Sequence, residues 1–328
     1  VCSSDLLPGE EKQLLRHIGI RKQENVRVNL NHLGEAILGE EEAKKRLSTY
    51  LEDLKKKEIE CVSVKISSIY SQINLLDWDN TLDVLRENLS ALYLEAKKNK
   101  IKLHDGSSRY KFVYLDMEEY KDLHLTVALF KEVLSQKEFF DLSAGIVLQS
   151  YLPDSYALHE ELIAFAKDRV KKGGAPIKIR LVKGANMALE ELESAIQGFP
   201  KAPYSSKKEV DANYKKMMRL GLSQENAPYA HLGIGSHNLF DIALGLILRA
   251  ENGTEEFSGF EMLEGMAEPL RRSLSQITGE ILLYCPAAKE EDFVNALAYL
   301  VRRLDENTAP DNFLTHLFDL KAGNRDWY

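Results

Sequence analysis

The feature that most constrains this chain is an alternation, repeated eight times, of short β-rich apolar runs with longer amphipathic segments. The candidate strands are 26–31, 60–67, 111–116, 144–150, 177–183, 229–235, 257–263 and 280–285. Several are near-continuous hydrophobic runs, which are typical of parallel strands covered on both faces. The alternation therefore predicts an α/β protein built on a parallel sheet.

The segments between these runs carry the spacing of surface helices. Apolar residues recur at intervals of three and four over 43–54, 82–96 and 158–170, while Lys and Glu fill the opposite faces. A helix that covers a sheet on one side and meets water on the other needs this arrangement.

Eight strand–helix units whose starts fall within about 250 residues match a (βα)8 TIM-like barrel. We expect the barrel to span 26–314, with a helical lead-in over 1–25 and a C-terminal tail over 315–328. A doubly wound open sheet is the competing architecture. Two long connections, 101–109 and 198–208, are candidates for ligand-contacting loops.

Composition narrows the class of protein. The 328 residues carry a net charge of −8, which argues against general nucleic-acid binding. No stretch is apolar for long enough to span a bilayer, and the three cysteines suggest neither a disulfide framework nor a zinc site. The chain lacks an initiating Met and a signal-like start, so we expect it to be part of something longer.

In such a barrel, catalytic side chains lie at the carboxyl ends of the strands. The polar residues predicted there are Lys65, Asp116, Gln149, Arg180, Lys183, Ser236, His237 and Tyr284. Plainer interpretations exist for single members: Lys65 could extend along the rim, Asp116 could cap the next helix, and His237 could be structural. Because buried charges must be paired, so dense a ring is better explained by a site than by a core.

The strongest local feature is AYLVRRLDEN, residues 298–307. Tyr299, Arg302, Arg303 and Glu306 share one broad helix face at spacings of three and four. Two adjacent guanidinium groups suit a carboxylate, which they can grip with planar, bidentate geometry. The alternative is a solvated charged face on which Glu306 is the partner.

Other chemistries fit less well. Asn31-His32 supplies no HxH metal motif, and 233–238 (GIGSHN) begins like a dinucleotide fingerprint but lacks the third glycine. A Schiff-base lyase or aldolase stays open because Lys65 and Lys183 both lie at strand ends. A non-catalytic barrel scaffold is the remaining alternative.

Eight motifs in chain order then carry a resemblance. They are VSVKISSIY, RYKFVYLDMEEY, GIVLQSYLPDS, IRLVKGAN, GSHN, FEMLEGMAEP, LLYCPAA and AYLVRRLDEN. Together they resemble the FAD-dependent proline dehydrogenases, especially the proline dehydrogenase domain of the bacterial bifunctional proline utilization A enzymes. The resemblance runs from about Val26 to Leu314.

The resemblance implies a distorted barrel that holds FAD noncovalently, with the last helix over its mouth. It implies oxidation of L-proline to Δ1-pyrroline-5-carboxylate by hydride transfer from C5 to flavin N5, and electron transfer to a quinone. It further implies a bacterial cytoplasmic location with peripheral contact to the inner membrane, and coupling to a pyrroline-5-carboxylate dehydrogenase that the C-terminal tail could join. No nucleic-acid partner is expected.

The family's roles carry over residue by residue. The cofactor positions would be Asp116, Gln149, Arg180, Val182, Lys183, Gly184, Ala185, Ser205, Lys207, Ser236, His237 and Leu263. Of these, Arg180 would lie beside flavin N5, Gln149 at the isoalloxazine edge, and Ser205 and Lys207 near the adenosine phosphates or ribose. Ser236 and His237 would contact the ribityl or pyrophosphate region.

The resemblance also implies the substrate positions. These would be Lys65, Leu263, Tyr284, Tyr299, Arg302 and Arg303, with the two arginines on the carboxylate of proline. Glu35 would pair with the first arginine to gate the site, and Lys65, Asp116 and Arg180 would be the catalytic groups. One departure is Asn186-Met187 after the KGA motif, where some relatives carry aromatic residues.

Overall fold

A closed parallel barrel forms the centre of the molecule in the computed structural model, which describes residues 6–33, 39–102, 106–184, 186–290, 296–297 and 299–301. Its strands are β2 (Val26–His32), β3 (Cys61–Val64), β6 (Phe112–Leu115), β7 (Gly145–Gln149), β8 (Ile177–Val182), β9 (Ala230–Gly235), β10 (Ser258–Leu263) and β11 (Ile281–Ala288). Each strand pairs in parallel with the next.

The pairing of the last strand with the first closes the barrel. Strand β11 runs beside β2 in a register that extends from Ile281 opposite Val26 to Ala287 opposite His32. The predicted eight-stranded barrel is therefore confirmed, and the open sheet is wrong. A short strand that the sequence pattern missed, β1 (Leu7–Pro8), pairs with the end of β11 at Ala287 and Ala288.

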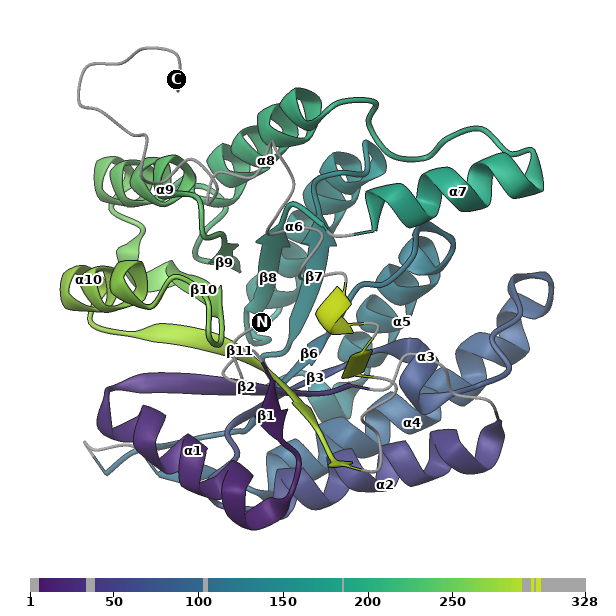
Figure 1. Cartoon of the computed structure of the whole chain (residues 1–328), viewed down its shortest axis with the longest axis horizontal. Helices are drawn as coiled ribbons and strands as arrows, with labels where there is room; N and C mark the ends of the chain where they lie inside the picture. The colour runs from purple at the N-terminus through teal and green to yellow at the C-terminus, as the bar shows by residue number, and fades with distance from the viewer. Residues whose placement is uncertain are drawn as a thin grey trace.

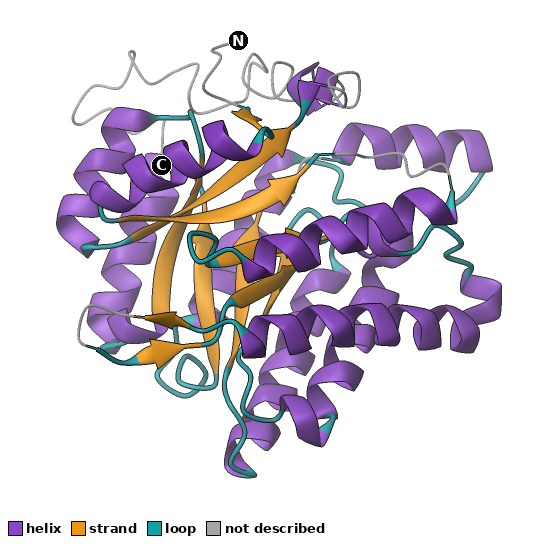
Figure 2. Ribbon diagram, turned by 90° about the horizontal axis from the view of Figure 1, so that it is seen from below, coloured by secondary structure: helices purple, strands orange, loops and turns teal. Residues whose placement is uncertain are grey.

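Helices surround the strands on the outside (Figures 1 and 2). They are α1 (Glu11–Gln23), α2 (Glu40–Lys55), α3 (Ile66–Ile69), α4 (Trp78–Lys98), α5 (Leu123–Ser135), α6 (Asp154–Lys171), α7 (Met187–Gln197), α8 (Lys207–Gly221), α9 (Leu239–Asn252) and α10 (Glu268–Thr278). Among the described residues, no helix is both long enough and apolar enough to cross a membrane.

Two predicted segments differ from the structure. The run 60–67 is too long as a strand, because β3 ends at Val64 and Lys65 becomes the N-cap of the single-turn helix α3. The connection 101–109 contains a small antiparallel pair, β4 (Ile101–Lys102) and β5 (Ser108–Arg109). It follows a helix, so it lies at the amino-terminal end of the barrel and not at the predicted ligand-binding end.

The core follows the predicted stripes. On α4, the side chains of Leu85, Leu89, Leu92 and Ala96 are completely buried. Burying a leucine side chain contributes about 1.5–3 kcal/mol relative to leaving it exposed, so a helix with such a face is held mainly by packing onto the strands. The two described cysteines, Cys61 and Cys285, are buried free thiols.

One buried polar side chain on α6 gives a pH-dependent prediction. His159 is fully buried, and neither ring nitrogen has a hydrogen-bond partner within the described part of the chain. Burial lowers the pKa of His159 from 6.5 to about 4. The unfolded chain therefore binds this proton more readily than the folded chain, and stability is lost as the pH falls from about 6.5 towards 4.

We expect this histidine to cost the native state about 2 kcal/mol of unfolding free energy between pH 7 and pH 5. Leucine at position 159 should remove that part of the pH dependence, which urea unfolding at several pH values would measure. His124→Leu is the matched control, because the His124 side chain is 57% exposed. An equal decline in the wild type and in His159→Leu would contradict the prediction.

Candidate active site at the carboxyl end of the barrel

Arg180 lies at the centre of the barrel mouth. It is on β8, where alternate side chains point into the barrel, and it is only 4% exposed. Its guanidinium carbon lies 3.9 Å from the ring centre of Tyr114 and 5.2 Å from that of Tyr284. The cation is thus held between two aromatic faces from β6 and β11, which favours its charged form.

Polar neighbours orient this guanidinium. Nε donates to Glu261 at 2.5 Å, and Nη1 donates to Asp116 Oδ1 and to Ser63 Oγ at 3.4 Å each. Nη2 is buried and has no hydrogen-bond partner among the residues that the structure describes. The Nη2 amino group of a buried, fixed cation, with its two N–H donors, is therefore left for a ligand.

Asp116 joins Arg180 to a tyrosine and does not cap a helix. Its Oδ2 accepts a hydrogen bond from the Tyr284 hydroxyl at 2.9 Å, and Asp122 occupies the N-cap of α5. Burial raises the pKa of Asp116, against the opposing effects of Arg180 and Lys65. The capping interpretation is therefore wrong, and the carboxylate belongs to the mouth.

Lys65 lies at the rim beside the same group. Its Nζ is 3.6 Å from Glu118 Oε1, and about a fifth of its side chain is exposed. Its positive charge opposes the burial that raises the pKa of Asp116, so Lys65 contributes to the electrostatics of the cluster around Arg180. Lys65 is thus partly solvated and close to the mouth. This position is compatible both with a side chain that extends along the rim and with a residue of the site.

Glu261 lies inside the barrel under Arg180. It accepts hydrogen bonds from the Tyr114 hydroxyl at 2.5 Å and from Lys178 Nζ at 2.8 Å, besides that from Arg180. Burial opposes ionisation, but Lys178 and Arg180 outweigh it and lower the pKa of Glu261 to about 2. A Cβ at Gly233 would collide with Oε1 of this carboxylate, which explains the glycine without any nucleotide motif.

Lys183 and Ser236 form a second cluster at the ends of β8 and β9. Lys183 Nζ lies 2.5 Å from Asp211 Oδ1 and 2.8 Å from Asp241 Oδ2, and the Ser236 hydroxyl donates to Asp241 at 3.0 Å. Burial opposes the charge, but the two carboxylates raise the pKa of Lys183. A Schiff-base nucleophile must be neutral, so this environment disfavours Lys183 as an aldolase lysine.

The turns that follow β7 and β8 are tied together. Gly184 has φ +104°, and a Cβ there would collide with the ring of Tyr151. The amide of Tyr151 donates to the Lys183 carbonyl at 2.9 Å, and that of Ser150 to the Val182 carbonyl at 2.8 Å. Next to them, Gln149 is buried, and its Oε1 has no hydrogen-bond partner in the described ranges.

The remaining predicted residues lie around this centre. His237 Nε2 accepts the Leu263 amide at 3.0 Å, so the ring holds the ends of β9 and β10 together, as its structural interpretation required. The Tyr204 amide donates to the Tyr151 carbonyl at 2.9 Å and brings the segment that carries Ser205 to the mouth. Lys207 is the first residue of α8, after a capping box at Ser206.

Residues 296–297 and 299–301 are helical. Tyr299 is 8% exposed and packs with Leu33, Ala288 and Ala296. Burial, Asp116 and Tyr299 together raise the pKa of Tyr284, so the two tyrosines lie close to each other. The predicted Glu35, Ala185, Arg302 and Arg303 lie outside the described residues.

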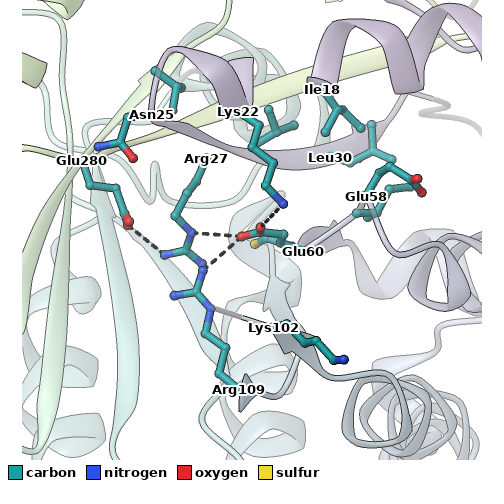
Figure 3. A pocket seen from close by; sticks show the side chains of 14 residues that line it. Ile18, Lys22, Asn25, Arg27, Leu30, Glu58, Glu60, Lys102, Arg109 and Glu280 are labelled. Atoms are coloured by element: carbon teal, nitrogen blue, oxygen red, sulfur yellow. Dashed lines mark hydrogen bonds and ion pairs between the residues drawn. The ribbon is translucent and has the colours of Figure 1, made fainter. Parts of the chain in front are cut away.

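A cavity of about 150 Å³ lies at the opposite, amino-terminal end (Figure 3). Glu60 is at its centre, 3.0 Å from Arg109, 3.4 Å from Arg27 and 3.8 Å from Lys22. Arg27 also pairs with Glu280 at 3.0 Å. This end of a barrel serves stability, and Glu60 holds Arg27, Arg109 and Lys22 in ion pairs, so we place the active site at the mouth.

Several residues at the mouth, and inside the barrel beneath it, were not identified from the sequence. They are Ser63, Tyr114, Lys178, Asp211, Asp241 and Glu261. Lys178 and Glu261 carry a signal that could have been used, because each is a charged residue inside an apolar strand run. Each also lies two positions from a predicted site residue, and therefore on the same inward face.

Comparison with known proteins gives one consistent match. The family model described as "Proline dehydrogenase" matches residues 14–316. The bifunctional protein PutA of Salmonella typhimurium is 26% identical over 269 residues, which cover 79% of this chain and 19% of that protein. Proline dehydrogenase 2 of Bacillus subtilis is 25% identical over 283 residues, 85% of this chain and 77% of the relative.

A solved structure agrees with the sequence matches. Proline utilization A from Corynebacterium freiburgense superimposes with a TM-score of 0.86 and 41% identity, covering 98% of this chain and 33% of that one. The chain thus spans a fifth to a third of the PutA proteins that it matches. Because the family model covers most of its length, the chain belongs to the proline dehydrogenase family.

Proposed function

We propose that the protein is an FAD-dependent dehydrogenase that oxidises L-proline to Δ1-pyrroline-5-carboxylate. The observation that carries this proposal is the buried Arg180, whose Nη2 amino group lies at the barrel mouth without a partner among the described residues. Membership of the proline dehydrogenase family supports it. The relatives' names, which include Proline dehydrogenase 2, agree with it.

The residues at the mouth fit a flavin. A flavin ring edge offers both hydrogen-bond acceptors and an N–H donor, and two orphaned atoms match them: Arg180 Nη2 can donate and Gln149 Oε1 can accept. Gly184, in a conformation that favours glycine, lets the turn after β8 pass close to the ring of Tyr151 beside them. Val182, Ala185, Asp116 and Leu263 complete the expected cradle.

The pyrophosphate and ribose groups of FAD need side chains that can donate hydrogen bonds to them. We assign this role to Ser236, His237, Ser205 and Lys207, with Lys183 nearby. Asp211 and Asp241 offset the charge of Lys183, so we expect Lys183 to contribute fixed hydrogen bonds more than net positive charge.

In the reaction, proline loses two electrons and two protons: the C5–H bond supplies a hydride, the ring nitrogen releases a proton, and a C=N bond forms. When bound, FAD supplies the hydride acceptor and is left as FADH2. The protein's part is to hold the ring. Leu263, Tyr284 and Tyr299 would pack on it, and Arg302 and Arg303 would grip the carboxylate, with Glu35 as the gate and Lys65 at the rim.

A quinone is the proposed final acceptor, taking two electrons and two protons from FADH2. We propose a bacterial cytoplasmic protein that touches the inner membrane peripherally to meet that quinone and that passes its product to a pyrroline-5-carboxylate dehydrogenase. We also propose one catalytic domain over 26–314, preceded by the lead-in 1–25 and followed by the tail 315–328.

The test is a visible absorption spectrum of the purified protein after incubation with FAD. We expect a visible absorption band of bound, oxidised flavin that bleaches anaerobically on addition of L-proline and not of L-alanine, which has no ring. A protein that retains no flavin, or a flavin that proline leaves oxidised, would overturn the proposal. Trapping of a carbonyl substrate on Lys65 by borohydride would support the lyase instead.

A further inference from the structure

Three side chains form a line of alternating charge inside the barrel. Lys178 and Arg180 lie two positions apart on β8, and Glu261 on β10 lies between their cationic ends. Its carboxylate is 2.8 Å from Lys178 Nζ and 2.5 Å from Arg180 Nε. Glu261 is 3% exposed, and Lys178 reaches partly to solvent with about a fifth of its side chain exposed. These charges therefore interact through protein more than through water.

Glu261 fixes the direction in which Arg180 points. It accepts the hydrogen bond from Nε, Asp116 and Ser63 accept those from Nη1, and the guanidinium lies over the ring of Tyr114. With these contacts made, Nη2 is the nitrogen that lacks a partner among the described residues. Without the Glu261 carboxylate, the guanidinium would lose the bond that sets its plane.

Glu261 also offsets the charge of Arg180. A cation near a flavin stabilises the negative charge that the ring gains on reduction, and a carboxylate behind that cation weakens this effect. Lys178, on the far side of Glu261, acts in the opposite direction because it offsets the carboxylate. The two residues should therefore shift the electrostatic potential at the mouth with opposite signs.

We propose that Glu261 is a positioning residue that orients Arg180 and lowers the reduction potential of the flavin. Lys178 opposes this effect because it partly neutralises the Glu261 carboxylate. The proposal rests on the proposed flavin site. It predicts that losing each charge shifts the flavin potential in opposite directions. Losing both charges should therefore change the potential less than losing either one.

The experiment measures the flavin midpoint potential of Glu261→Gln, Lys178→Met and the double variant, by anaerobic equilibrium with a reference dye. Glu261→Gln should favour reduced flavin by about tenfold in the equilibrium constant, which is about 30 mV for a two-electron couple. Lys178→Met should shift the equilibrium the other way, and the double variant should return close to the wild type.

Glu264→Gln is the matched control. Glu264 is equally buried at the end of the same strand, but it pairs with Arg21 and His17 on α1 and not with Arg180. We expect it to leave the potential unchanged even if it lowers stability. If Glu261→Gln fails to fold, Lys178→Met alone still tests the direction in which the flavin midpoint potential shifts.

The outcomes separate the two proposals. A wild-type protein that binds no flavin overturns the proposed function. Flavin-loaded Glu261→Gln and Lys178→Met variants whose potentials are unchanged, or shift in the same direction, overturn the role of Glu261 and leave the proposed function standing.

Discussion

Alanine at Arg302 or at Arg303 should raise KM for L-proline by about 100-fold while leaving the flavin content unchanged. A hydrogen-bonded ion pair at a buried site is worth about 1.5–3 kcal/mol, and a tenfold change in affinity corresponds to about 1.4 kcal/mol. Tyr299, three residues before Arg302, is buried beside Leu33 and Ala288 and is one of the residues assigned to the proline ring. Steady-state kinetics with a flavin absorbance measurement would check it.

Two controls make this result specific. Arg302→Lys keeps the charge but loses the planar fork, so its KM should lie between those of the wild type and the alanine variant. Arg272→Ala removes an arginine of α10 whose side chain is 72% exposed, and KM should not change. Loss of flavin with KM unchanged would mean that the arginine pair binds the cofactor and not the substrate.

Replacing Arg169 by methionine should lower the free energy of unfolding by about 3–5 kcal/mol. Arg169, at the end of α6, is 2% exposed, and all of its acceptors are backbone carbonyls: Leu134, Phe139, Phe140, Leu142 and Ala175. These carbonyls belong to the segments that lead into β7 and β8. Methionine fills much of the space but leaves several buried acceptors without donors.

Urea unfolding followed by circular dichroism would measure this loss. Arg86→Met is the matched control, because Arg86 pairs with Asp83 and Glu132 at the surface and such pairs contribute at most about 1 kcal/mol. The loss of unfolding free energy for Arg169→Lys should lie between those of Arg169→Met and Arg86→Met, since one ammonium reaches fewer carbonyls than a guanidinium. A loss for Arg169→Met no larger than that of the control would contradict the structural role.

The barrel could be predicted because its signals are local and repeated. Each βα unit carries an apolar run and a helical stripe, and the count of units selects closure over an open sheet. The pattern failed where a few residues decide the geometry: the strand at 60–67 stops at Val64 because the chain turns into α3 at Lys65. The two residues of β1 were missed because so short a strand has no periodicity.

The site could be predicted only in part. Residues such as Asp116, Gln149 and Arg180 could be located because the ends of parallel strands meet at one end of a barrel. Their partners could not be assigned, since Asp241 and Glu261 reach their contacts from other strands and helices. Arg169 shows the same limit: its position places it on the buried face of α6 with Leu158 and Leu162, but only the packed structure shows which backbone carbonyls it meets.

Gly233 restricts the order in which this barrel can change over evolution. The absence of its side chain leaves the space that the Glu261 carboxylate occupies, so the two positions share one small volume. A lineage that shortens the acid first can later accept a methyl group on β9. The other order passes through a crowded intermediate, so in both directions the path between such variants runs through the form that has the glycine and the shortened acid.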